Sequence, residues 1–72
     1  MTKREFNLQL GANIRRAREA AGIRQNELAA AIGFWPSQMC RVEQGTQKIG
    51  VNQLRWLAGA LGVSAVSLLP QL

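Results

Sequence analysis

The fold is decided by residues 25–45, which read QNELAAAIGFWPSQMCRVEQG. Gly33 interrupts a helical pattern and offers the backbone freedom that a sharp turn requires. Pro36 suits the first position of a new helix, because its missing N–H would have no partner there. The pattern therefore predicts two short helices, at 25–32 and 36–44, joined by a tight turn.

The apolar residues within this stretch recur at the spacing of a helix-turn-helix. Ala29 must be small, because the second of the two helices crosses close above it. The larger apolar side chains fill the wedge between these helices and the rest of the domain, and they are Leu28, Ile32, Phe34, Met39 and Val42. A match at all of these positions together is more specific for a helix-turn-helix than a match at any one of them. It predicts a helix-turn-helix at about residues 25–44.

The sequence before this stretch predicts one long helix. Thr2 and Glu5 have the spacing of a capping box, in which each side chain satisfies a backbone N–H of the first turn. One face of the helix is then apolar, and Gly22 follows as its stop. The residues expected on the buried face are Phe6, Leu10, Ile14, Ala17 and Ala21.

The sequence after this stretch predicts two more helices. The first covers about residues 51–61. Its expected inward positions are Val51, Leu54, Leu57, Ala58 and Leu61. The second covers about residues 65–69, where Ser64 can cap the start and Pro70 follows the end. The chain is therefore expected to form one all-α domain of five helices over residues 1–72.

The composition favours binding of nucleic acid over a catalytic function. Nine Lys and Arg against four Glu give a net charge of +5, which favours a polyanion, nucleic acid before a membrane surface. The single Cys40 and the absence of His exclude an internal disulfide and the usual zinc sites. Four scattered glutamates without Asp, His or Tyr make no acid–base constellation. We therefore expect no enzyme, no metal, no cofactor and no small-molecule substrate.

The N-terminal residues carry several charges and lack the apolar segment of a signal peptide. No window approaches the ~20 apolar residues of a membrane span. A cytoplasmic protein without membrane contact is expected.

With these helices in place, the sequence resembles the lambda repressor and Cro-like family of helix-turn-helix regulators over about residues 8 to 69. The residues that carry the resemblance are Arg18, Gly22, Gln25, Glu27-Leu28-Ala29, Ile32-Gly33, RVEQG at 41–45 and LAGALGVS at 57–64. The resemblance implies a buried ion pair between Arg18 and Glu43. It also implies that Gln25 binds a DNA phosphate.

The base-reading positions implied by the resemblance are Pro36, Ser37 and Arg41, with Gln38 close by. On a helix that begins at Pro36, these side chains can enter the major groove, where Arg donates two hydrogen bonds to guanine and Gln pairs with adenine. Arg41 is the strongest candidate. Trp35 stands where the family usually has a Ser or Thr N-cap, and Pro36 replaces a polar reading residue. Trp35 is expected either to contact DNA or to pack on the domain's own edge.

Residues on both sides of the reading helix are candidates for phosphate contacts. Side chains at a helix N-terminus and backbone N–H groups of the loop after the reading helix can bind phosphate oxygens. The candidates are Arg24, Gln25, Thr46, Gln47 and Lys48.

Apolar residues near the C-terminal end exceed what a small core needs, and they are Trp56, Val66, Leu69 and Leu72. Their economical use is a two-fold homodimer, in agreement with the resemblance. The alternative is that they close the core of one monomer. We therefore expect a dimeric repressor that binds double-stranded DNA at an inverted repeat. The alternative from another class is an interaction module, such as an antitoxin, whose C-terminal apolar face binds a partner protein.

Overall fold

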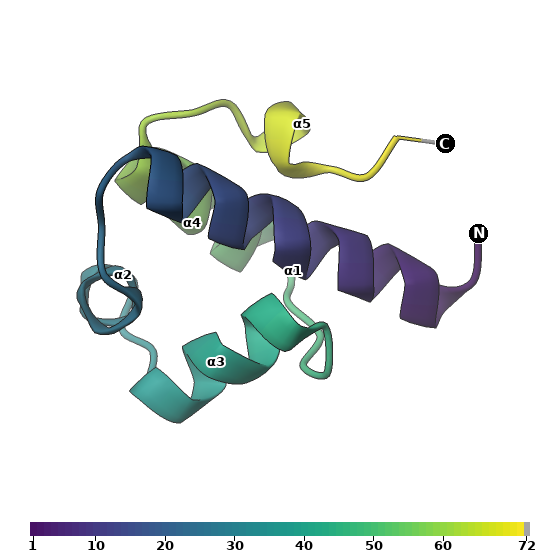
Figure 1. Cartoon of the computed structure of the whole chain (residues 1–72), viewed down its shortest axis with the longest axis horizontal. Helices are drawn as coiled ribbons and strands as arrows, with labels where there is room; N and C mark the ends of the chain where they lie inside the picture. The colour runs from purple at the N-terminus through teal and green to yellow at the C-terminus, as the bar shows by residue number, and fades with distance from the viewer. Residues whose placement is uncertain (72) are drawn as a thin grey trace.

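The computed structural model describes residues 1–71. These form five α-helices, which are α1 (Lys3–Ala20), α2 (Gln25–Ala31), α3 (Pro36–Gln44), α4 (Val51–Leu61) and α5 (Ala65–Leu68). In Figure 1, α1 crosses the middle of the molecule, with α3 below it, α5 above it and α4 behind it. The expected five-helix, all-α fold is confirmed for these residues, and the observed bounds of α3 and α4 equal the expected ones.

Local hydrogen bonds explain where the helices begin. At α1 the capping box is complete, because Glu5 N donates to Thr2 Oγ1 at 3.1 Å and Thr2 N donates to Glu5 Oε1 at 3.2 Å. The next three helices use half of this arrangement, in which a Glu or Gln in the first turn accepts a hydrogen bond from the N-cap backbone. These acceptors are Glu27, Gln38 and Gln53. The turn after α2 depends on Gly33, whose φ of 75° suits glycine.

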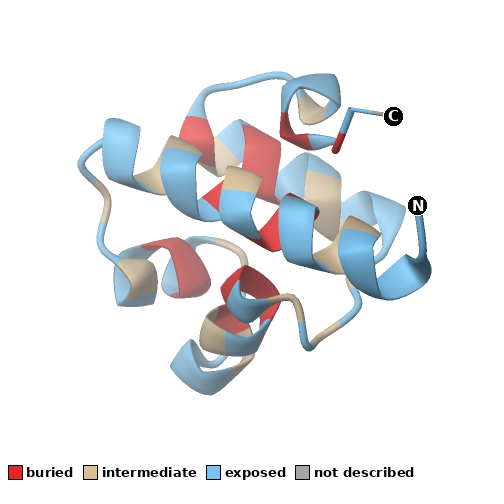
Figure 2. Cartoon of the chain, turned by 45° about the vertical axis from the view of Figure 1, so that its right-hand side comes forward, coloured by how far each residue is buried: buried red, intermediate tan, exposed pale blue. Residues whose placement is uncertain are grey.

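The core lies between α1, α2, α3 and α4 and is closed by α5 (Figure 2). Its buried apolar residues are Leu10, Ile14, Leu28, Ala29, Met39, Val42, Leu57, Ala58, Leu61 and Leu68. Two expected core positions are wrong. Val51 is 75% exposed, because it is the first residue of α4 and the packed stripe of that helix starts only at Leu54. Ala21 is exposed, because it lies past the end of α1, in the turn toward Gly22.

The backbones of α1 and α3 touch directly. A Cβ atom added to Gly11 in α1 would lie 2.4 Å from the carbonyl oxygen of Val42. At the end of α3, a Cβ on Gly45 would lie 2.7 Å from Leu8 Cα. Glycine at both places lets α3 lie against α1 without an intervening side chain, so the position of α3 is fixed by backbone contact.

The last helix is tied to the first. Asn13 Nδ2 of α1 donates a hydrogen bond of 3.0 Å to the carbonyl oxygen of Leu68 in α5. Leu68 and Pro70 are both buried, so this segment covers the core that α1 and α4 leave open. Within residues 1–71, no helix is both long and apolar enough to cross a membrane.

Candidate nucleic-acid interface

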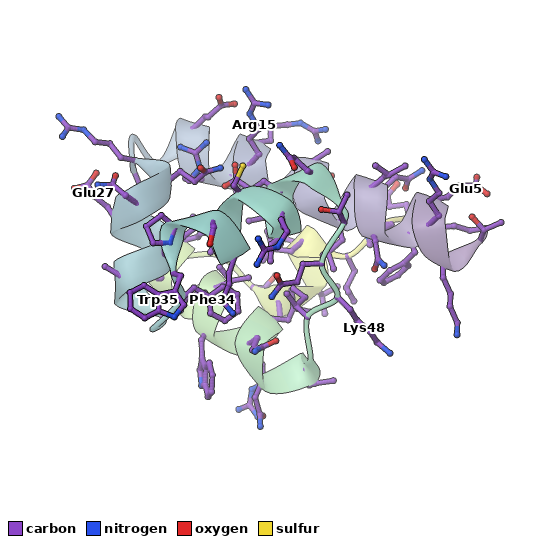
Figure 3. All side chains as sticks on the ribbon, turned by 90° about the horizontal axis from the view of Figure 1, so that it is seen from below. Glu5, Arg15, Glu27, Phe34, Trp35 and Lys48 are labelled. Atoms are coloured by element: carbon purple, nitrogen blue, oxygen red, sulfur yellow. The ribbon has the colours of Figure 1, made fainter. Side chains whose placement is uncertain are left out.

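Helix α3 has one buried side and one exposed side. Met39, Val42 and Glu43 are buried against α1 and α2. The side chains left exposed along α3 are those of Pro36, Ser37, Arg41 and Gln44. Figure 3 looks onto this side, with α3 in front of the other helices.

An ion pair beneath α3 holds it to α1. Arg18 Nε donates to Glu43 Oε2 at 2.7 Å, and Arg18 Nη2 donates to Glu43 Oε1 at 3.2 Å. The Glu43 side chain is only 4% exposed, so the pair is shielded from water and salt. The hydrogen bond to Glu43 raises the pKa of Arg18 further above its already high usual range, despite the opposing effect of burial. The Arg18 guanidinium therefore stays positively charged throughout the range in which proteins are stable.

Gln25 completes this cluster. Its Nε2 donates to Glu43 Oε1 at 3.0 Å, and the residue is half-buried. A phosphate contact is the role that the resemblance implies for Gln25. The structure gives its amide a contact within the protein, which the sequence pattern did not indicate. Gln25 therefore links α2 to α3 beside the exposed surface.

The front of α3 differs from the expected reading surface in one respect. Gln38 Oε1 accepts a hydrogen bond of 2.8 Å from the backbone N–H of Trp35, and Gln38 is half-buried. Recognition of adenine by glutamine uses both the amide oxygen and the amide nitrogen. To read adenine, Gln38 would have to use an amide oxygen that already accepts one hydrogen bond. Pro36 and Ser37 are exposed beside it.

Arg41 lies further along the exposed side and is tied to the loop that follows α3. Its Nε donates to Gln47 Oε1 at 3.2 Å. Its carbonyl oxygen accepts hydrogen bonds from Thr46 N at 3.0 Å and Thr46 Oγ1 at 3.3 Å. The expectation of a free backbone N–H at Thr46 is therefore wrong, because this donor closes the end of α3. Lys48, at the far end of the loop, is exposed.

The surface of this molecule is strongly cationic, because the chain has nine Lys and Arg against four Glu. All four glutamates have partners within the chain: Thr2 for Glu5, Arg15 for Glu19, the Arg24 backbone for Glu27, and Arg18 for Glu43. Arg24, Arg41 and Lys48 are exposed around α2, α3 and the following loop. Residues 1–71 bring together no three Cys, Asp or Glu side chains that could hold a metal ion.

Trp35 is the N-cap of α3 and is 75% exposed. The interpretation in which its indole packs on the domain's own edge is therefore wrong. The preceding Phe34 instead packs against the core. Trp35 lies at the start of α3, and Lys48 lies beyond its other end, in the loop toward α4 (Figure 3).

The residues expected at a dimer interface are spread over two surfaces. Trp56 lines a shallow hollow with Ala31 and Ile32 at the end of α2. Leu69 lines a different one with Asn13 and other residues of α1. Trp56, Val66 and Leu69 are all exposed, so they are not consumed by the core of one chain. Leu72 lies outside the described residues.

This arrangement of helices has close parallels. Residues 9–70 match the model of a family described as the helix-turn-helix domain. The chain belongs to this helix-turn-helix family. No curated protein matches the chain. Its resemblance to the lambda repressor and Cro-like type of DNA-binding regulator is confirmed by solved structures.

Three of these structures are regulators. The clp gene regulator ClgR from Corynebacterium glutamicum is 29% identical, with a TM-score of 0.84, and the match covers 86% of this chain and 66% of that one. The restriction-modification controller protein C.AhdI from Aeromonas hydrophila is 30% identical, with a TM-score of 0.81 and coverages of 85% and 92%. The DNA-binding domain of BldD is 28% identical, with a TM-score of 0.84 and coverages of 97% and 100%.

The same helix-turn-helix fold also occurs within an enzyme. Hydroxypropylphosphonic acid epoxidase from S. wedmorenis is 26% identical, with a TM-score of 0.86, but the chain spans only 36% of its length. The fold by itself therefore identifies a DNA-binding type of domain without deciding what surrounds it.

Proposed function

We propose that this helix-turn-helix chain is a sequence-specific regulator of transcription that binds an inverted-repeat operator as a homodimer and represses from it. The observation that carries the proposal is the two-sided α3. Its inner side is fixed by the Gly11 contact and the Arg18–Glu43 pair, while Ser37 and Arg41 face outward. A rigid helix that presents polar side chains fits the major groove, which is ~12 Å wide.

Arg41 is the principal base-reading residue in this proposal. Its guanidinium can donate two parallel hydrogen bonds to O6 and N7 of guanine. Its present partner, Gln47, holds the side chain through Nε alone. Ser37 and Pro36 contact the bases ahead of it, and Gln38 is a further candidate whose amide oxygen also caps α3.

Phosphate contacts position the helix. Arg24 precedes α2, and Lys48 lies in the loop beyond α3, so the two exposed cations flank the reading helix. Gln25 and Gln47 lie next to them and supply shorter-range contacts, whereas both donors of Thr46 already bind the Arg41 carbonyl oxygen. Such contacts fix register and orientation without reading sequence.

The exposed apolar side chains of Val66, Leu69 and Trp56 support dimerisation, with Leu72 as a further candidate. A two-fold dimer would place two α3 helices about 34 Å apart, one turn of DNA. We propose no catalytic role, since the chain has no His, Asp or Tyr and its four glutamates already have partners.

One observation favours a second candidate function. Val66 is 76% exposed on the short α5 and Trp56 is exposed on α4, which is apolar surface that DNA binding does not use. A protein partner, such as a toxin paired with an antitoxin, could cover it. In that case DNA binding would be secondary.

The test is selection of duplexes from a random DNA pool by the purified 72-residue chain at physiological salt, followed by sequencing. We expect an inverted repeat with half-sites about 10–11 base pairs apart. Recovery of DNA without a preferred sequence would contradict sequence-specific regulation and favour the protein-partner function. Recovery of a single unrepeated half-site would contradict the dimer.

A further inference from the structure

The fold leaves the side chain of Trp35 unused. The residue is 75% exposed, while its neighbour Phe34 packs against the core. Single exposed apolar residues are common on protein surfaces, so exposure alone does not indicate a function. What distinguishes Trp35 is the combination of exposure with its position in α3.

Trp35 is an unfavourable choice for that position. It is the N-cap of α3, with extended backbone, and its side chain makes no capping hydrogen bond. N-cap positions favour Ser, Thr, Asp and Asn, and α1 and α5 use Thr2 and Ser64 in this way. The N-caps of α2 and α4, Arg24 and Gly50, also make no side-chain capping bond, but Trp35 alone of the three places a large apolar side chain there. Only the backbone of Trp35 supports the start of α3, where its carbonyl oxygen accepts hydrogen bonds from Gln38 N and Met39 N. A residue that breaks a local rule without a structural gain is expected at a functional site.

The surroundings of Trp35 indicate what it contacts. Pro36 follows it and is also exposed, so the front of α3 presents an apolar surface made by Trp35 and Pro36. Arg24, Arg41 and Lys48 are exposed on the neighbouring segments, which favours a polyanion over an apolar protein surface as the occupant. In a helix-turn-helix, the N-terminal residues of the reading helix contact base edges.

The chemistry of the groove then selects the ligand. The apolar group that base edges present in the major groove is the C5-methyl of thymine, and 5-methylcytosine carries the same group. We infer that Trp35, together with Pro36, is a specificity-determining contact that reads the C5-methyl group of a pyrimidine. The inference rests on the DNA-binding function proposed above. Burial of one methyl group corresponds to about a fourfold change in affinity.

The experiment uses the full chain and the operator recovered by selection. Each thymine is replaced in turn by uracil, which removes the methyl and keeps the base pair. At one or two positions in each half-site we expect uracil to weaken binding about fourfold. In Trp35→Ser this ratio should fall to one. Because serine is a favoured N-cap, the variant should fold with an unchanged or higher melting temperature.

Two comparisons sharpen the experiment. Val51→Ala is a control that changes an equally exposed apolar residue away from α3, since Val51 is the first residue of α4. This variant should keep the full thymine-to-uracil ratio. At the sensitive position, 5-methylcytosine is also compared with cytosine. Preference for the methylated base supports reading of the methyl on either pyrimidine, and equal binding supports reading of thymine alone.

Three outcomes would overturn the inference. A ratio that survives in Trp35→Ser would assign the methyl contact to another residue. If uracil binds as well as thymine at every position and the operator is still preferred, the DNA-binding function stands and the methyl contact is contradicted. If the selection yields no operator, both the sequence-specific DNA-binding function and the methyl contact are contradicted.

Discussion

Glu43 accepts three hydrogen bonds, two from Arg18 and one from Gln25, and its own side chain is almost fully buried. A buried carboxylate is tolerated only while its partners remain, because an unpaired buried charge is costly. The three donors come from α1 and α2, and the acceptor comes from α3. One side chain thus joins the three helices that form the candidate interface.

Removal of the cation from this cluster should destabilise the fold strongly. We expect Arg18→Ala to lower the free energy of unfolding by about 3–5 kcal/mol, because the buried Glu43 side chain loses its main partner. Urea denaturation measures the loss. Arg15→Ala is the matched control, since Arg15 and Glu19 form an exposed pair at 3.5 Å. That control should cost at most about 1 kcal/mol. Equal losses in the two variants would contradict a special role for Glu43.

Arg41 supplies the residue-scale test of base reading. Arg41→Ala should reduce the preference for operator over unrelated DNA by about 1–3 kcal/mol, through loss of a bidentate contact with guanine. Competition binding at fixed salt measures the ratio. Arg55→Ala removes an exposed arginine from α4 and should lower affinity for both DNAs alike, if at all. Unchanged preference in Arg41→Ala would show that another residue reads the operator.

At the scale of the elements, the helix ends could be predicted well from the sequence and the site only in outline. Thr2, Pro36 and Gly22 determine their helix ends through local geometry, which short sequence patterns capture. The apolar periodicity predicts that Val51 is buried, because the pattern continues into the first turn of α4. No other element covers Val51 there, so the residue is exposed. The capping bond of Gln38 could not be predicted, because a side-chain amide can bind either solvent or a nearby backbone N–H, and the sequence does not reveal which.

The contact of α1 with α3 gives a pair of opposite predictions for glycine. Gly11→Ala should destabilise the fold by about 1–3 kcal/mol, since its Cβ would collide with backbone that cannot yield as a side chain would. Gly59→Ala in α4 meets nothing within 4 Å and should stabilise by about 0.5–1 kcal/mol. Thermal unfolding of both variants measures the contrast. Stabilisation by alanine at both sites would show that the two helices are not in backbone contact.

At the scale of the whole molecule, the apolar surface around α5 has a testable consequence. Val66→Asp adds a charge at a residue that is already exposed, so the monomer should keep its melting temperature. If Val66 lies in a dimer interface, the variant should sediment as a monomer at concentrations where the native chain is dimeric. Dimers that persist in Val66→Asp would place the interface elsewhere.

Net charge makes a second prediction at this scale. With about five phosphates neutralised by each bound domain, log affinity should fall with log salt at a slope of roughly −4 to −5. Lys48→Ala should reduce the magnitude of this slope by about one and weaken operator and unrelated DNA equally. A slope near zero would contradict phosphate contacts as the positioning layer. Titrations at several salt concentrations measure it.

The hydrogen bond from Asn13 to Leu68 spans 55 positions of the chain, and it has a consequence for synthesis. On the ribosome, α1 emerges first, and the helix that covers it emerges last of the five. A nascent chain that has reached only Gly62 lacks Leu68, so the apolar face of α1 is still partly open. The core should therefore close in one late step, after the three helices of the candidate interface have already emerged.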